Sequence, residues 1–130
     1  MVAALRVHVG AGSVERGAEG LIDWVEGEPD GFRRLPQATQ DELLTNAATA
    51  GPTYAVPAPR VTCRQLRGLR LPLLVLRGEQ TRAWYRLIAE ATANCIRGAE
   101  TAVIPAARHM TIVENPSGTA SLVLRFIMRH

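Results

Sequence analysis

Lysine is absent from this sequence, so all 15 basic residues are arginine, and they are interleaved with 12 acidic residues for a formal net charge of +3. The densest basic segment holds Arg60, Arg64, Arg67 and Arg70, with no aromatic side chain between them. Proteins that read nucleic acid combine basic residues with aromatic rings on which bases stack. Because a solvated linker explains this segment as well as a phosphate track does, we expect no nucleic-acid partner.

Cysteine and histidine are scarce: the chain has Cys63 and Cys95 as its cysteines, and His8, His109 and His130 as its histidines. The cysteines form no Cys-x-x-Cys pair and the histidines lie far apart, so neither a metal site nor a cofactor is expected. Reduced thiols in a cytoplasm fit this usage best. Cys95 lies on the apolar side of a helical pattern, which predicts a small core residue.

No run of the sequence is long and apolar enough to suggest a membrane span. The N-terminal MVAALRVHVGAG is apolar, but Arg6 and His8 interrupt it. A membrane helix needs roughly 20 consecutive apolar residues. We therefore expect a soluble, unexported protein with no membrane partner.

The composition is that of a globular chain. Its 130 residues are 47% hydrophobic and 21% charged, which suits one ordinary domain. The first half predicts a helix over 14–26, capped by Ser13, and a second helix over 36–50, opened by Pro36. The proline-rich segment 51–61 then predicts a loop that leads to the second half.

The second half predicts an α/β arrangement. The apolar run LRLPLLVLRG, with a strand near 71–77, and TAVIP, residues 101–105, are typical of strands buried on both faces of a parallel sheet. A helix over 82–97, capped by Thr81, joins them into a right-handed βαβ unit. A last helix follows over 116–129.

The last helix begins with Asn115 as its cap and Pro116 as its first residue. The apolar faces expected to be buried are Trp84, Leu87, Ile88, Ala91 and Cys95 on the middle helix and Ala120, Val123, Leu124 and Ile127 on the last helix.

His109 lies just beyond the carboxyl end of the second strand. Ligands and catalytic groups gather at that edge of open α/β sheets, so His109 is a candidate functional residue, with a solvated surface histidine as the alternative.

Residues 69–130 resemble the C-terminal end of an α/β-hydrolase. LRLPLLVLRGEQT is similar to the family's strand with a Gly-x-x-acid turn, and AETAVIPAARHMTIVENP to its last strand, catalytic-histidine loop and Glu-x-Pro helix start. ERGAEGLIDWVEGEPDGFRRLP and TNAAT resemble the helical cap of many members. The resemblance implies a cap-like region with linker over 1–66 and the C-terminal βαβα part of a hydrolase domain over 67–130, with a short parallel sheet flanked by helices.

By this resemblance His109 is the general base of a nucleophile-His-acid triad that acts on esters or related small-molecule bonds. Thr81 stands at the acid position of the Gly-x-x-acid turn. Glu79 is a local alternative, and Asp23 and Glu114 are weaker ones. Some members place the acid after an earlier strand, which leaves its position open.

The nucleophile is the larger departure from the family's pattern. It belongs in a Gly-x-Ser-x-Gly elbow, and Ser13, Ser117 and Ser121 all lack that context. We therefore expect the chain alone to be inactive, and to act on a small-molecule substrate only when completed by an N-terminal part. It is then a truncated hydrolase, a fragment completed by another chain, or a non-catalytic module that docks through its exposed sheet edge. That edge also favours self-association, unless the cap helices cover it.

Overall fold

The computed structural model of the chain describes residues 14–49 and 60–130. These residues belong to two compact units that divide between Pro59 and Arg60. The sequence placed the boundary after residue 66. The short helix α5 (Cys63–Leu66) packs against the later helix α6 (Ala83–Cys95), so it forms part of the second unit.

The first unit is helical. Its elements are α2 (Val14–Glu26), the 3₁₀ turn η1 (Phe32–Arg34), α3 (Gln37–Thr45) and the 3₁₀ turn η2 (Ala47–Thr49). α2 has the predicted bounds, while the predicted Ser13 cap and the linker residues 51–59 lie outside the described part. Gly27 ends α2 with a left-handed φ of 79°, and Asp23 Oδ1 accepts a hydrogen bond from Phe32 N at 2.8 Å. The buried apolar side chains of this unit are Ile22, Phe32, Leu35 and Ala47.

The second helix is shorter than the predicted span of 36–50. Pro36 precedes α3 as its N-cap, and the α-helix ends at Thr45 before the chain tightens into η2. The Asn46 side chain donates to the Glu42 carbonyl at 3.0 Å, and the Asn46 backbone N–H uses the same oxygen. Asparagine side chains compete in this way for helical backbone groups, which favours a helix end at this residue.

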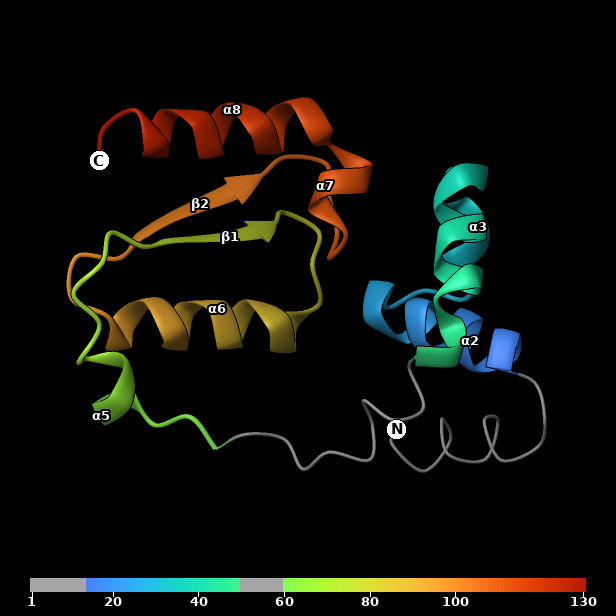
Figure 1. The fold of residues 1–130 in the computed structure, drawn as a ribbon, viewed down its shortest axis with the longest axis horizontal. Helices are drawn as coiled ribbons and strands as arrows, with labels where there is room; N and C mark the ends of the chain where they lie inside the picture. The colour runs from blue at the N-terminus through green and yellow to red at the C-terminus, as the bar shows by residue number, and fades with distance from the viewer. Residues whose placement is uncertain (1–13, 50–59) are drawn as a thin grey trace. The chain divides into compact units, whose positions relative to one another are not determined.

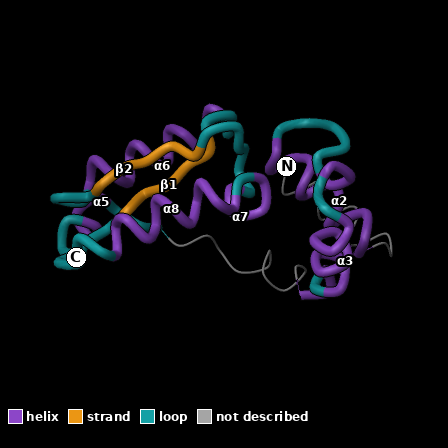
Figure 2. The backbone as a smooth tube through the Cα atoms, turned by 90° about the horizontal axis from the view of Figure 1, so that it is seen from above, coloured by secondary structure: helices purple, strands orange, loops and turns teal. Residues whose placement is uncertain are grey.

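The second unit is a parallel two-stranded sheet with a helix on either side. β1 (Leu74–Gly78) and β2 (Glu100–Ile104) pair in parallel, with Leu74 opposite Glu100 and Gly78 opposite Ile104. α6 connects the strands and lies along β1, and α8 (Pro116–Ile127) lies along β2 (Figure 1; Figure 2). The predicted parallel pairing and the α/β fold class are confirmed.

The starts of the two long helices differ in how well the sequence predicted them. Asn115 caps α8 as expected, with its Oδ1 accepting from Gly118 N at 2.8 Å and Pro116 as the first helical residue. The one-turn helix α7 (Thr111–Glu114), which was not predicted, precedes it. Thr81 does not cap α6, because Arg82 occupies the N-cap position, where its side chain makes no capping hydrogen bond.

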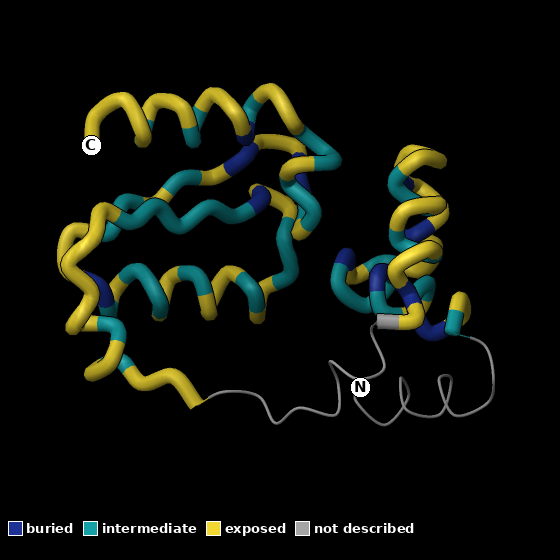
Figure 3. The backbone as a smooth tube through the Cα atoms, viewed as in Figure 1, coloured by how far each residue is buried: buried dark blue, intermediate teal, exposed yellow. Residues whose placement is uncertain are grey.

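The predicted burial of the helix faces is wrong in large part. Leu87 is 61% exposed on α6, and Leu124 is 58% exposed on α8. Exposed residues recur along both helices (Figure 3). Of the predicted α6 face only Cys95 is partly buried, and the other partly buried side chains of this helix are Tyr85, Ala89, Thr92 and Ala93. A sheet of two strands is too narrow to cover a full apolar stripe on each helix. For the same reason β1 is half-buried along most of its length, and only its last residue, Gly78, is fully buried.

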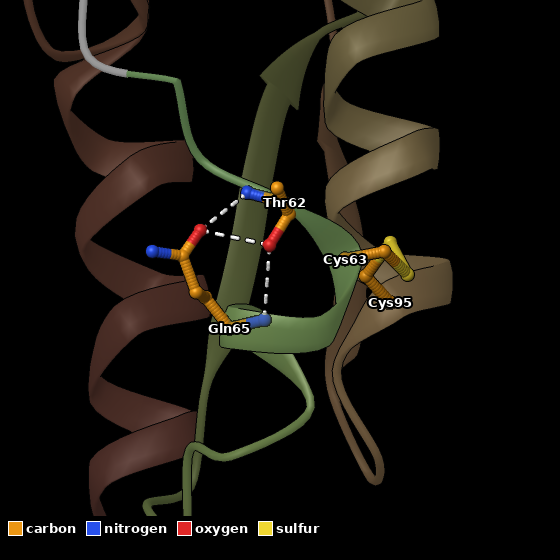
Figure 4. Close-up of a disulfide and its surroundings, with 4 residues drawn as sticks. All are labelled: Thr62, Cys63, Gln65 and Cys95. Atoms are coloured by element: carbon orange, nitrogen blue, oxygen red, sulfur yellow. Dashed lines mark hydrogen bonds between the residues drawn. A yellow bond between two sulfur atoms is a disulfide. The ribbon is translucent and has the colours of Figure 1, made fainter.

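The expectation of reduced thiols is also wrong. Cys63 and Cys95 form a disulfide with their Cα atoms 5.1 Å apart, which joins α5 to the end of α6 (Figure 4). A capping box places Cys63: Thr62 Oγ1 accepts from Gln65 N at 3.3 Å, and Gln65 Oε1 accepts from Thr62 N at 2.8 Å. Disulfides persist in oxidising compartments, so the cytoplasmic prediction loses the support that reduced thiols would provide.

No described helix is long and apolar enough to cross a membrane.

We expect reduction of this disulfide to destabilise the second unit. The bond links residues 32 apart in sequence, and closing a loop of that length lowers the entropy of the unfolded chain by an amount equivalent to about 3 to 4 kcal/mol. Chemical denaturation of the oxidised chain, with and without reductant, measures this difference. A Cys63→Ser/Cys95→Ser variant is the control, because reductant must leave its midpoint unchanged. An equal midpoint for the oxidised and reduced wild-type chain would contradict the prediction.

Candidate functional site

A close backbone contact between the end of β1 and the segment after β2 builds the candidate site. We call residues 105–110 the histidine loop. A Cβ atom added to Gly78 would lie 1.8 Å from the Arg108 carbonyl oxygen and 2.2 Å from that of Ala107. Only glycine allows this approach, and the neighbouring Ile104 and Ala107 side chains have no exposed surface. The turn after β1 completes the contact, since Gln80 N donates to Ala107 O at 2.9 Å.

Side chains from both sides of the histidine loop hold its backbone in place. Glu79 Oε2 accepts from Ala106 N at 2.9 Å, where Ala106 has a left-handed φ of 52°. Asn115 Nδ2 donates to Pro105 O at 2.9 Å. The start of the loop is therefore held from two sides, by Glu79 in the turn after β1 and by Asn115, the N-cap of α8.

Glu114 fixes the loop next to the histidine. Its carboxylate accepts from Arg108 N at 2.5 Å and from the Arg108 guanidinium at 3.3 Å. Two of the candidate acids named from the sequence, Glu79 and Glu114, thus bond to the backbone of the histidine loop. Asp23, the third candidate, belongs to the first unit and accepts from Phe32 N. Within the described residues, no hydrogen bond or ion pair joins the His109 ring to a carboxylate.

His109 lies in this loop at the carboxyl edge of the sheet, where its side chain is partly accessible, as the sequence predicted. Its ring stacks on Tyr85 of α6, with the ring centroids 4.2 Å apart and the planes 29° apart. Partial burial lowers the pKa of His109 below its ordinary value of 6.5, and the Glu114 carboxylate opposes this by favouring the protonated ring. The lowered pKa favours the neutral imidazole, which is the form able to accept a proton.

A cavity of about 280 Å³ lies between β1, α6 and the histidine loop. His109 and Tyr85 line it together with Thr81, Gly78 and several apolar side chains, among them Ile88. Thr81, at the position where a carboxylate was expected, thus shares the cavity with the histidine. A neutral base on the wall of a small, largely apolar cavity suits proton transfer to and from a bound molecule.

The described residues do not place a serine in this cavity. Ser117 and Ser121 lie on α8 and are exposed, and Ser13 lies outside the described part. Among residues 14–49 and 60–130, no cluster of His, Cys, Asp or Glu side chains could hold a metal ion. The residue that sequence reasoning missed is Tyr85, which was assigned no role because its helix position lies 24 residues before the histidine it contacts.

Comparison with known proteins supports the fold and leaves the chemistry open. No protein-family model and no curated protein sequence matches the chain. A solved structure, the carboxylesterase CesB (YbfK) from Bacillus subtilis, matches with a TM-score of 0.69 over 89% of this chain, at 22% sequence identity. The chain spans 42% of that esterase, less than half of its length. The chain therefore has the fold of the C-terminal part of an α/β-hydrolase, and the resemblance seen in the sequence is confirmed at the level of the fold.

We expect Gly78→Ala to unfold or strongly destabilise the second unit. The new methyl group must displace the Arg108 and Ala107 carbonyls, because both are backbone atoms that cannot turn away. Overpacking of this kind should cost about 3 kcal/mol or more. Gly20→Ala on α2 is the matched control, since no atom lies within 4 Å of its added Cβ. In a helix that change should stabilise by about 0.5 to 1 kcal/mol. Equal denaturation midpoints for the two variants would contradict the close approach.

We expect the pKa of His109, measured by NMR titration, to lie below 6.5, and the Tyr85 ring to be responsible for part of the shift. Tyr85→Phe keeps the stacked ring and should keep the low pKa, whereas Tyr85→Ala admits water and should raise it toward 6.5. Because the unfolded chain binds the proton more readily, stability should fall as pH drops below 6.5 and level off below the folded-state pKa. A His109 pKa that is the same in all three proteins would contradict the role of Tyr85.

Proposed function

We propose that this chain is the general-base part of an α/β-hydrolase that acts on esters or related small-molecule bonds, with His109 as the base. The position of His109 carries the proposal: it directly follows a parallel strand and lines a cavity beside Tyr85. The solved structure with the similar fold is a carboxylesterase, which supports ester bonds as the substrate class.

In this proposal the nucleophile and the oxyanion donors come from an N-terminal part that is not among the 130 residues. The chain spans 42% of the carboxylesterase, which leaves room for a segment that carries the nucleophile elbow. The helices within residues 14–49 would correspond to the cap region that the sequence resembles. The coding sequence upstream of Met1, read for a strand followed by Gly-x-Ser-x-Gly, is the simplest test of this arrangement.

His109 would move one proton back and forth in each half of the reaction. In acylation it takes the proton from the nucleophile hydroxyl as that oxygen attacks the ester carbonyl, and donates it to the leaving alcohol oxygen. In deacylation it takes a proton from the water that attacks the acyl-enzyme carbonyl, and returns it to the nucleophile oxygen as the carboxylic acid leaves. The lowered pKa keeps the ring ready to accept a proton at pH 7. The Glu114 charge favours the imidazolium that forms, although its carboxylate bonds directly to Arg108 and not to the ring.

We expect His109→Ala to abolish ester hydrolysis by the completed enzyme, with a loss of about 10⁴-fold or more in kcat and little change in stability. His130→Ala is the matched control, because His130 is an exposed histidine bonded to Glu100 and should leave turnover intact. The 130-residue chain alone should not hydrolyse small activated esters above background. Turnover by the chain alone, lost in His109→Ala, would show that a nucleophile lies within these residues and would contradict the completion step.

A non-catalytic docking module is the second candidate, and the exposed apolar side chains favour it. Leu87, Leu124 and Ile127 are 58 to 61% exposed on the helices that flank the sheet. An unpaired strand edge beside such faces invites strand addition from another chain. The module would dock a partner through this edge and these faces without any acyl chemistry.

We expect the purified chain to associate in solution, so that light scattering gives a mass above the 14.1 kDa of one chain. Leu87→Gln/Ile127→Gln should shift the mass toward the monomer, because it removes apolar surface from the helix faces. Ile112→Gln, on the separate helix α7 and 73% exposed, is the control and should leave the mass unchanged. A dispersed wild-type monomer with one cooperative thermal transition would contradict both the association and the completion by a second chain.

A further inference from the structure

The end of the sheet opposite the histidine carries a second groove, of about 670 Å³. Three arginines line it: Arg67 follows α5, Arg70 precedes β1, and Arg97 lies in the turn between α6 and β2. Both strands begin here, so the groove lies at their amino ends, away from His109. His130 also lines the groove, and no Asp or Glu is among the described residues that do so.

The three guanidinium groups have no counter-charge within the described part of the chain. None of them takes part in a hydrogen bond or ion pair there. The nearby Glu100 is already engaged, since it bonds to Arg129 and lies 2.9 Å from His130 Nε2. The free carbonyl groups at the C-terminal end of α6 attract cations, and this accounts for Arg97, which follows that helix. All three are exposed, and three at one groove create a positive potential that favours an anionic ligand.

We propose that this groove binds a soluble small molecule that carries phosphate groups. Guanidinium groups bind phosphate oxygens in pairs of parallel hydrogen bonds, which makes arginine suited to this chemistry. The volume is in the range of pockets for whole small molecules and exceeds what a single phosphate ion fills. The proposal uses residues of the second unit alone and does not depend on the proposed hydrolase function.

The disulfide holds two of the segments that line the groove next to each other. Cys95 lines the groove, and its bond to Cys63 holds α5, and with it Arg67, beside the turn that carries Arg97. The linear segment with Arg60, Arg64, Arg67 and Arg70 suggested a solvated linker. Folding separates its members, since Arg60 and Arg64 are not among the residues that line the groove. The reduced chain should therefore bind the anion more weakly than the oxidised chain.

Isothermal titration of the full oxidised chain with pyrophosphate, at constant ionic strength, tests the proposal. We expect saturable binding that Arg67→Gln and Arg97→Gln each weaken by about tenfold or more, the loss of one charged hydrogen-bond pair. Arg97→Lys keeps the charge and should lose less than Arg97→Gln. Arg86→Gln, an exposed arginine of α6 outside the groove, is the control and should bind as the wild type does. Circular dichroism confirms that each variant is folded.

Three results would overturn the proposal. Absence of saturable pyrophosphate binding would remove the site, and equal weakening in Arg86→Gln would show a diffuse effect of net charge. Binding to phosphatidylcholine vesicles that contain phosphatidic acid, without binding to pyrophosphate, would assign the arginines to a membrane surface in place of a soluble ligand. Unchanged affinity after reduction of Cys63–Cys95 would overturn the role given to the disulfide.

Discussion

The second unit depends on the contact between the end of β1 and the backbone of the histidine loop. Gly78 has no Cβ, so the Ala107 and Arg108 carbonyls can approach the strand to a distance that no other residue permits. The contact ends the pairing of the two strands and starts the histidine loop at the same point. Glu79 and Glu114 then hold that loop by accepting from its backbone N–H groups, which places His109 against α6. The position of the candidate base is thus a consequence of backbone packing.

The two ends of the sheet have different chemistry although the same elements build both. At the carboxyl ends of the strands, His109 and Tyr85 border a small, mainly apolar cavity in which a base stays neutral. At the amino ends, arginines from two loops, one before each strand, border a larger polar groove beside the disulfide. The two sets of lining residues have no member in common, so a substitution in one set leaves the other set unchanged.

The exposed apolar faces of α6 and α8 belong to a sequence patterned for a wider sheet than the described residues form. LPLLVL is patterned for a strand with neighbours on both sides and helices over both faces, yet the described sheet has two strands. The burial predicted for Leu87 and Leu124 fails for this reason. The patterns suit a wider sheet, in keeping with a chain that spans 42% of a carboxylesterase.

The sequence by itself determined the features that depend on neighbouring residues. The apolar runs, the Asn115-Pro116 helix start and the strand–helix–strand order predicted the elements, the parallel pairing and the place of His109, because periodicity and capping act over a few residues. The tertiary structure alone decided that Cys63 bonds to Cys95, that Tyr85 stacks on His109 and that Arg97 joins the arginines before β1. Each of these pairs joins residues more than 20 positions apart, and only the packing of α6 onto the sheet and of α5 onto α6 brings them together.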